Sequence, residues 1–149
     1  MNPGICFEKV WEDNDMSEVR IIACDGKSSF QIDVYVAHDD FPRKIKEIKI
    51  FKEQIYGGIY DLEFGSFGPE YARGAFFARF HFAQEIHGKI NISIKMESEF
   101  FPFGKRTVAS KGVLFLRTEP VLIDQFTEEL KYFDTTVGSR VELKCIKTE

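Results

Sequence analysis

The chain has 149 residues, 44% hydrophobic and 30% charged, and its formal net charge is −4 at neutral pH. This length predicts one domain, residues 1–149, that buries roughly two-thirds of its unfolded surface. The acidic balance argues against a general nucleic-acid binder, and no apolar stretch approaches the ~20 residues that cross a bilayer. The N-terminus shows no basic region followed by an apolar run, so we expect no signal peptide and a cytoplasmic protein.

Cysteine and phenylalanine are the two informative residue types. Cys6, Cys24 and Cys145 are widely separated and lack CxxC spacing, which indicates free thiols in a reducing compartment rather than disulfides or zinc ligands. There are sixteen phenylalanines. Most of them should lie in the core, because each can bury roughly 150–250 Å².

The first third of the chain predicts three strands in succession. Residues 5–11 form the first, with Phe7 and either Val10 or Trp11 inward. A polar break at 12–15 leads into a second strand over 17–24, and Asp25-Gly26 is a strong hairpin-turn signal. The third strand spans 30–36, where apolar and polar residues alternate with a period of two.

Two segments have the period of amphipathic helices. From Asp39 or Asp40, whose carboxylates suit a helix N-cap, apolar residues recur at three- and four-residue steps until Gly57-Gly58. The second helix opens at Glu119-Pro120, with acidic residues near its start and Lys131 near its end. The two expected apolar stripes are Phe41, Ile45, Ile48, Phe51 or Lys52 and Ile55, and Leu122, Ile123, Phe126, Leu130 and Phe133.

A central hairpin over 73–97 is the strongest strand signal, because two neighbouring runs alternate strictly. Further strands are expected at 59–64, 112–118 and 141–145, while 65–74 reads as a surface loop or wide turn and 99–110 as a long loop or an irregular edge. The order is β-β-β-α-β-β-β-β-α-β. This predicts an α+β fold: a mostly antiparallel sheet of about seven to eight strands, with two amphipathic helices packed on one face.

The sequence offers little chemistry. His38, His81 and His87 match no metal-binding spacing, and the glycines at 65–68 lack the lysine that a phosphate loop needs. Adjacent acids lie in expected turns and on helix faces, where they are solvated. We therefore expect no enzyme, no metal and no cofactor.

Phe77, Arg79 and His81 form an aromatic-basic mixture on one strand face, with Lys89 and Lys95 nearby, of the kind that stacks RNA bases. The acidic total and the lack of an RNP-type motif count against RNA, and we expect no nucleic-acid partner.

Four segments together resemble a group of small bacterial proteins: FQIDVYVAHDDF at 30–41, DLEFG at 61–65, 76–88 ending in His87-Gly88, and 119–130 from Glu119-Pro120 to Leu130. That group includes proteins similar to the immunity proteins of WapI-type, wall-associated contact-dependent toxins. The resemblance spans about residues 7–133. It implies an intracellular, non-catalytic inhibitor that binds a toxin domain directly.

We expect such a protein to occlude its toxin, with acidic side chains competing for a basic substrate-binding face. The expected contacts lie on the 12–15 turn, the 65–74 loop, the 100–106 loop and the acidic face of the second helix. An alternative from another class is a small-ligand-binding or homodimeric regulatory module that uses an exposed sheet face and shows a pocket or a broad aromatic patch. The candidate partner-binding residues are Glu12, Asp13, Asp15, Phe101, Phe103, Arg106, Glu128 and Glu129.

Overall fold

The computed structural model describes residues 2–54, 58–133 and 136–148. These ranges contain ten strands and two helices in an α+β arrangement, in the predicted order apart from one added pair of strands. The elements are β1 (Gly4–Glu12), β2 (Met16–Cys24), β3 (Ser29–Ala37), α1 (Asp40–Lys52), β4 (Ile59–Phe64), β5 (Ala75–Phe82), β6 (Ile90–Glu97), β7 (Phe101–Phe103), β8 (Arg106–Val108), β9 (Lys111–Thr118), α2 (Pro120–Leu130) and β10 (Arg140–Lys144).

The strands are divided between two four-stranded antiparallel sheets and one small hairpin. The first sheet has the order β10-β1-β2-β3 and the second the order β4-β5-β6-β9, while β7 and β8 pair only with each other. The predicted antiparallel pairing is confirmed, and the predicted count of seven to eight strands is too low. The difference is the β7–β8 hairpin, which lies where a long loop or an irregular edge was expected, because its Phe-Pro-Phe and Arg-Thr-Val runs are too short to show a period.

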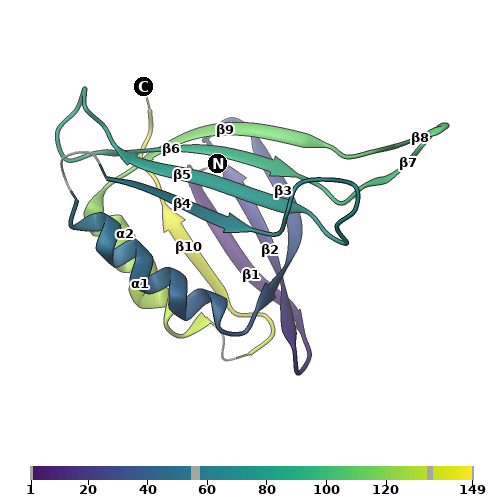
Figure 1. Ribbon diagram of the computed structural model, residues 1–149. Coiled ribbons are helices and arrows are strands. Elements are labelled where there is room, and N and C mark those ends of the chain that lie inside the picture. Colours follow the sequence, from purple (N-terminus) through teal and green to yellow (C-terminus); the bar gives the residue numbers. More distant parts are fainter. Residues whose placement is uncertain (1, 55–57, 134–135, 149) are drawn as a thin grey trace.

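The two sheets cross at a steep angle, and both helices fill the inner side (Figure 1). Both expected helical stripes are confirmed as buried except at Leu122 and Lys52, which are half-buried, whereas Ile55 and Gly57 lie outside the described residues. Phe7 of β1 is the centre of the core: its ring lies 5.8 Å from that of Phe64, 6.2 Å from Phe76 and 5.7 Å from Phe126. Residues from both sheets and both helices thus form one continuous core.

Two backbone contacts join the sheets at their margins. The Gly74 N–H donates to the carbonyl of Asp33 in β3 at 3.0 Å, and the Ile146 N–H donates to the carbonyl of Arg117 in β9 at 2.8 Å. A Cβ on Gly74 would lie 3.1 Å from the carbonyl oxygen of Asp33 and 2.7 Å from that of Glu97. Glycine is therefore needed at the first junction for the two backbones to approach.

The inward residue near the end of β1 is Lys9, not the expected Val10 or Trp11. A β-bulge between Lys9 and Trp11 shifts the register against β2, so that Lys9 is 1% exposed and Trp11 is 44% exposed. The ammonium of Lys9 reaches a carboxylate oxygen of Glu12 at 2.6 Å. Ile5, Phe7 and Lys9 keep the period of two, and the bulge after Lys9 inserts one residue and turns Trp11 outward.

Helix α1 also begins differently from the prediction. Asp39 is the N-cap residue but its side chain makes no cap hydrogen bond. Asp40 instead turns its carboxylate to Arg43 and Lys44 one turn further on. Lys44, which is buried, lies over the ring of Phe64 at 4.8 Å from its centroid.

Within the described part of the chain, no helix combines the length and apolar character that a membrane span requires.

Candidate functional site

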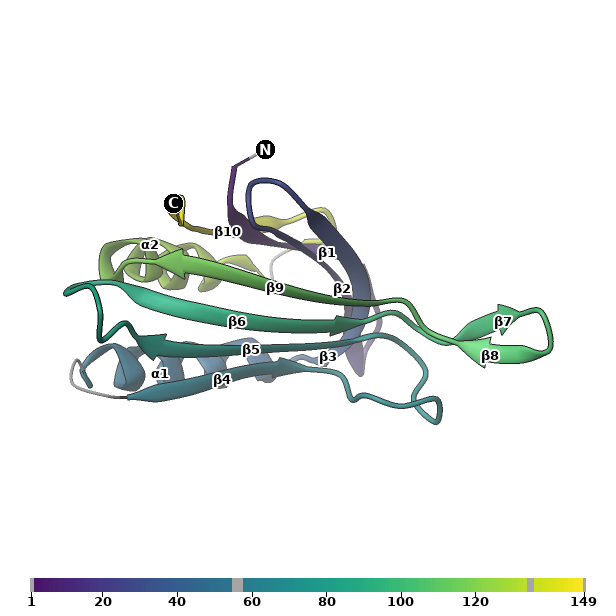
Figure 2. The same ribbon diagram turned by 90° about the horizontal axis from the view of Figure 1, so that it is seen from above.

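The β7–β8 hairpin projects away from the rest of the fold as an arm, which both ribbon views show (Figure 2). Phe101 pairs with Val108 and Phe103 with Arg106 across it, and Gly104 makes its tip with a φ of +65°. At its base the Ser98 N–H donates to the carbonyl of Ser110 at 2.9 Å. Phe101 is 38% exposed and Phe103 64%, so the arm presents two aromatic rings with Lys105 and Arg106 beside them.

The outer face of the second sheet is the second exposed apolar area. It faces away from the helices, and the register places Phe77 beside Lys95 and Lys95 beside Val113, with Phe115 two residues further along β9. Val113 and Phe115 are 59% and 65% exposed. We call Phe77, Val113 and Phe115 the outer-face patch.

The outer-face patch was not among the predicted contact residues, although the sequence contained a signal for it. In β9 both alternating sets are apolar, Leu114 and Leu116 on one side and Val113 and Phe115 on the other. Leu114 and Leu116 are buried and complete the core, so the second set has no core left to enter. A strand that is apolar on both sides, at the edge of a sheet with one open face, indicates such a surface.

Arg79 and His81 lie on the same outer face, as expected, but Arg79 is already engaged. Its guanidinium forms a two-point ion pair with Asp61 on the neighbouring strand, at 2.8 and 3.0 Å. This pair raises the pKa of Arg79 and lowers that of Asp61. The cation is therefore balanced within the sheet, which weakens the case for a phosphate-binding face.

The three acidic residues predicted near 12–15 lie at the turn between β1 and β2, where two of them have local structural partners. Glu12 pairs with Lys9. The Asp13 carboxylate accepts hydrogen bonds from the backbone N–H groups of Met16 and Asp15 at 2.9 and 2.8 Å, which lower its pKa. The turn is thus held by its own acids, and Asp13 keeps its charge well below neutral pH.

The acidic face of α2 is partly engaged as well. Glu128 accepts a hydrogen bond from Lys131 at 2.9 Å, which lowers the pKa of the glutamate. Asp124 forms an ion pair with Lys52 at the end of α1. Glu128 and Glu129 are both exposed on the side of α2 away from the core.

The 65–74 loop, also predicted as a contact, is tied to the fold. The Gly68 N–H donates to the buried carboxylate of Glu97 at 3.0 Å, and Arg73 bridges Glu18 and Glu99 at 3.0 Å each. Its role in the structure is to connect the two sheets.

The predicted site residues therefore fall into three separate groups. Phe101, Phe103 and Arg106 share the arm, and the other two groups lie at the β1–β2 turn and on α2 (Figure 1). The structure brings together only the members of each group.

The residues with chemical potential are dispersed in the same way. In the ranges 2–54, 58–133 and 136–148, no three or more His, Cys, Asp or Glu side chains are grouped so that they could hold a metal ion. His38 contacts the carbonyl of Asp13 through Nε2 at 2.8 Å. The three cysteines are free and half-buried, and burial raises the pKa of the Cys145 thiol to about 12.

Comparisons with protein-family models, with curated proteins and with solved structures found no match for this chain.

Proposed function

We propose that this chain is a non-catalytic binding protein of the immunity type, which neutralises a bacterial toxin in the cytoplasm by covering it. The observation that supports it best is the projecting arm with Phe101 and Phe103 exposed at its sides. Exposed aromatic rings beside an arginine are typical of the residues that contribute most to protein–protein affinity. A two-stranded arm can enter a cleft on a partner and exclude substrate from it.

The net charge of −4 supports the choice of a basic partner such as a nuclease toxin. Complementary charge speeds the encounter of two proteins more than it tightens their complex. Asp15 and Glu129 are exposed and can attract a basic partner. The neighbouring acids also carry charge, although they have structural partners in the β1–β2 turn and on α2.

Co-expression with the toxin domain encoded beside its gene tests the proposal. The wild-type chain should restore growth and Phe103→Ser should not, because serine removes the most exposed ring of the arm. Ile50→Ser is the matched control: Ile50 is 60% exposed, close to the 64% of Phe103, but lies on α1. Failure of the wild-type chain to rescue cells from any adjacent toxin would remove the immunity function.

A homodimeric regulatory module is a second candidate, favoured by the outer-face patch. Val113 and Phe115 are exposed on an open sheet face with Phe77 nearby, a surface that a second copy could cover. Light scattering after size exclusion at micromolar concentration separates the two candidates. A doubled mass that returns to the monomer in Phe115→Ser would favour the dimer, and a monomeric wild-type chain would exclude it.

A further inference from the structure

β9 is the edge strand of the second sheet, and the direction of its outward backbone groups follows from one hydrogen bond. Ile146 donates to the carbonyl of Arg117, so the N–H and C=O of Arg117 point away from β6. Because these groups alternate sides along an antiparallel strand, those of Phe115 and Val113 point outward as well. Among the described residues, no backbone partner beyond β6 lies against these two residues.

The other sheet margins each contact a further element of the fold. Helix α1 packs against β4 through Phe51 and Tyr60, and α2 lies along β10. On β3, Asp33 accepts the hydrogen bond from Gly74. The free part of β9 is bounded by the Phe30 ring, which lies where a Cβ of Gly112 would be, and by Ile146 at Arg117.

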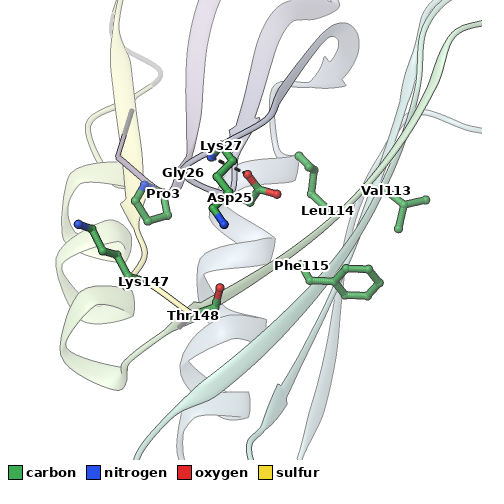
Figure 3. Close-up of a pocket in the computed structure, with 9 residues that line it drawn as sticks. All are labelled: Pro3, Asp25, Gly26, Lys27, Val113, Leu114, Phe115, Lys147 and Thr148. Atoms are coloured by element: carbon green, nitrogen blue, oxygen red, sulfur yellow. Dashed lines mark hydrogen bonds between the residues drawn. The ribbon is translucent and has the colours of Figure 1, made fainter.

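A cleft of about 480 Å³ lies along this free edge. Val113, Leu114 and Phe115 form one wall, and the β2–β3 turn, Pro3 and the C-terminal residues Lys147 and Thr148 form the other (Figure 3). The side chains of Val113 and Phe115 point away from the cleft, so the backbone of β9 faces it. The cleft therefore offers strand hydrogen bonds rather than an apolar pocket.

The charges of the cleft favour an anionic occupant. Lys27 and Lys147 line it, and neither makes an ion pair with a residue in the described ranges. The one acid in the lining is Asp25, whose carboxylate accepts the backbone N–H groups of Lys27 and Ser28 at 2.8 and 2.7 Å. Those bonds hold the Asp25 carboxylate within the β2–β3 turn. The ammonium groups of Lys27 and Lys147 therefore remain for a ligand.

A second copy of this chain fits the edge poorly. A second β9 lying antiparallel and centred on Leu114 would place Lys111 opposite Arg117 at both ends of the pair. Like charges directly opposite each other destabilise a strand pair.

We propose that the free edge of β9 binds an extended acidic peptide segment, which adds to the second sheet as a short fifth strand. The outward N–H and C=O groups of Val113 and Phe115 hydrogen-bond its backbone. Lys27 and Lys147 pair with its carboxylates. This inference does not rest on the immunity function, because backbone groups and lysines carry it rather than the exposed aromatic rings.

The probe is a blocked hexapeptide that alternates valine with glutamate, titrated into the isotope-labelled full chain while amide NMR signals are recorded. We expect the largest shifts at Val113, Phe115 and the Asp25–Lys27 turn. The same peptide with lysine in place of glutamate should bind at least tenfold more weakly, as should the glutamate peptide N-methylated at alternate amides. Shifts centred elsewhere, or equal binding of all three peptides, would overturn the proposal.

Lys27→Glu and Lys105→Glu form a matched pair of variants, since each makes the same charge change at an exposed turn. Lys27→Glu should weaken binding of the glutamate peptide at least tenfold, whereas Lys105→Glu, on the arm, should leave it within twofold of wild type. An equal loss in both variants would show a non-specific charge effect and overturn the site. Toxin rescue by Lys27→Glu is a separate readout, so the peptide site and the immunity function can fail independently.

Discussion

At the scale of single residues, glycines with positive φ mark where the backbone is most constrained. Gly65, just after β4, and Gly104, at the tip of the arm, have similar values of +70° and +65°. A Cβ on Gly65 would lie 2.3 Å from the carbonyl oxygen of Gly74, whereas one on Gly104 would meet nothing within 4 Å. Alanine at either position would meet a similar conformational cost from the positive φ. Only Gly65 also lacks room for a Cβ.

We therefore predict different effects of alanine at these two glycines. Gly104→Ala should lower the free energy of unfolding by no more than about 1 kcal/mol, the low end of the cost of a left-handed conformation, because the arm carries none of the core. Gly65→Ala should lower it further, because the backbone of the loop must move to relieve the contact. Urea denaturation of both variants measures the difference, and equal losses would show that the loop yields without cost.

The thiol of Cys145 should resist alkylation. Its pKa is raised to about 12 by burial, whereas an ordinary thiol has a pKa of about 8.5. At pH 9.5 Cys145 should remain a neutral thiol in the folded chain and react with iodoacetamide much more slowly than it does in urea. Mass spectrometry of the modified peptides reads this out, and equal rates in both states would contradict it.

The same shift has a consequence for stability. The pKa of Cys145 is higher in the folded than in the unfolded state, so its contribution is complete below about pH 8.5 and is lost as the pH rises towards 12. Cys145→Ala should flatten the decline of stability across this window. A decline of unchanged slope in that variant would assign it to other groups.

At the scale of elements, α2 is held by its buried stripe and not by its surface charges. Phe126 is 2% exposed and contacts the ring of Phe7 in β1. The ion pair between Lys52 and Asp124 joins α1 to α2 at the surface, with the aspartate side chain 51% exposed. Exposed pairs contribute little, because water screens them and both side chains lose freedom.

Two alanine variants should separate these contributions. Phe126→Ala should lower the free energy of unfolding by about 3–5 kcal/mol through lost burial and a cavity. Lys52→Ala should lower it by less than about 1 kcal/mol. Thermal unfolding of both variants measures the comparison, and a larger loss for Lys52→Ala would show that the ion pair fixes the helix.

The sequence predicts best those helices and strands in which the repeat of buried residues continues along the whole element. The stripe of α1 and the alternation of β5 against β6 were confirmed because burial on one side imposes a repeat on the residues. Trp11 and the arm escaped prediction for opposite reasons: a bulge after Lys9 breaks the period before Trp11, and the arm has no buried side to impose one. The division into two sheets depends on contacts between distant residues such as Gly74 and Asp33, which no local pattern contains.

The candidate binding surfaces were likewise predictable only in part from the sequence. Phe101, Phe103 and Arg106 were proposed from composition, and the structure places them together on the arm. The acids at 12–15 were proposed for their charge, but two of them hold the turn. Whether a charged group is available or already paired depends on neighbours that the sequence does not identify.

At the scale of the whole molecule, the two sheets and the two helices build one common core. The arm takes no part in that core. The aromatic rings of the core contact one another across β1, β4, β5 and both helices. The arm pairs only with itself and is closed at its base by the hydrogen bonds between Ser98 and Ser110. Stability and partner binding should therefore depend on different parts of the chain.

Removing the arm tests this separation. Replacing residues 100–108 with an Asn-Gly turn keeps Ser98 and Ser110, so β6 and β9 remain joined by a shorter connection that costs no more to close. The free energy of unfolding should stay within about 1 kcal/mol of wild type, since the arm contributes no buried side chain to the core. Affinity for the partner toxin, measured by calorimetry, should fall at least a hundredfold if the arm enters the partner's cleft. A shortened chain that unfolds more easily but binds as tightly as wild type would reverse both assignments, making the arm a structural element and moving the contact surface to another face.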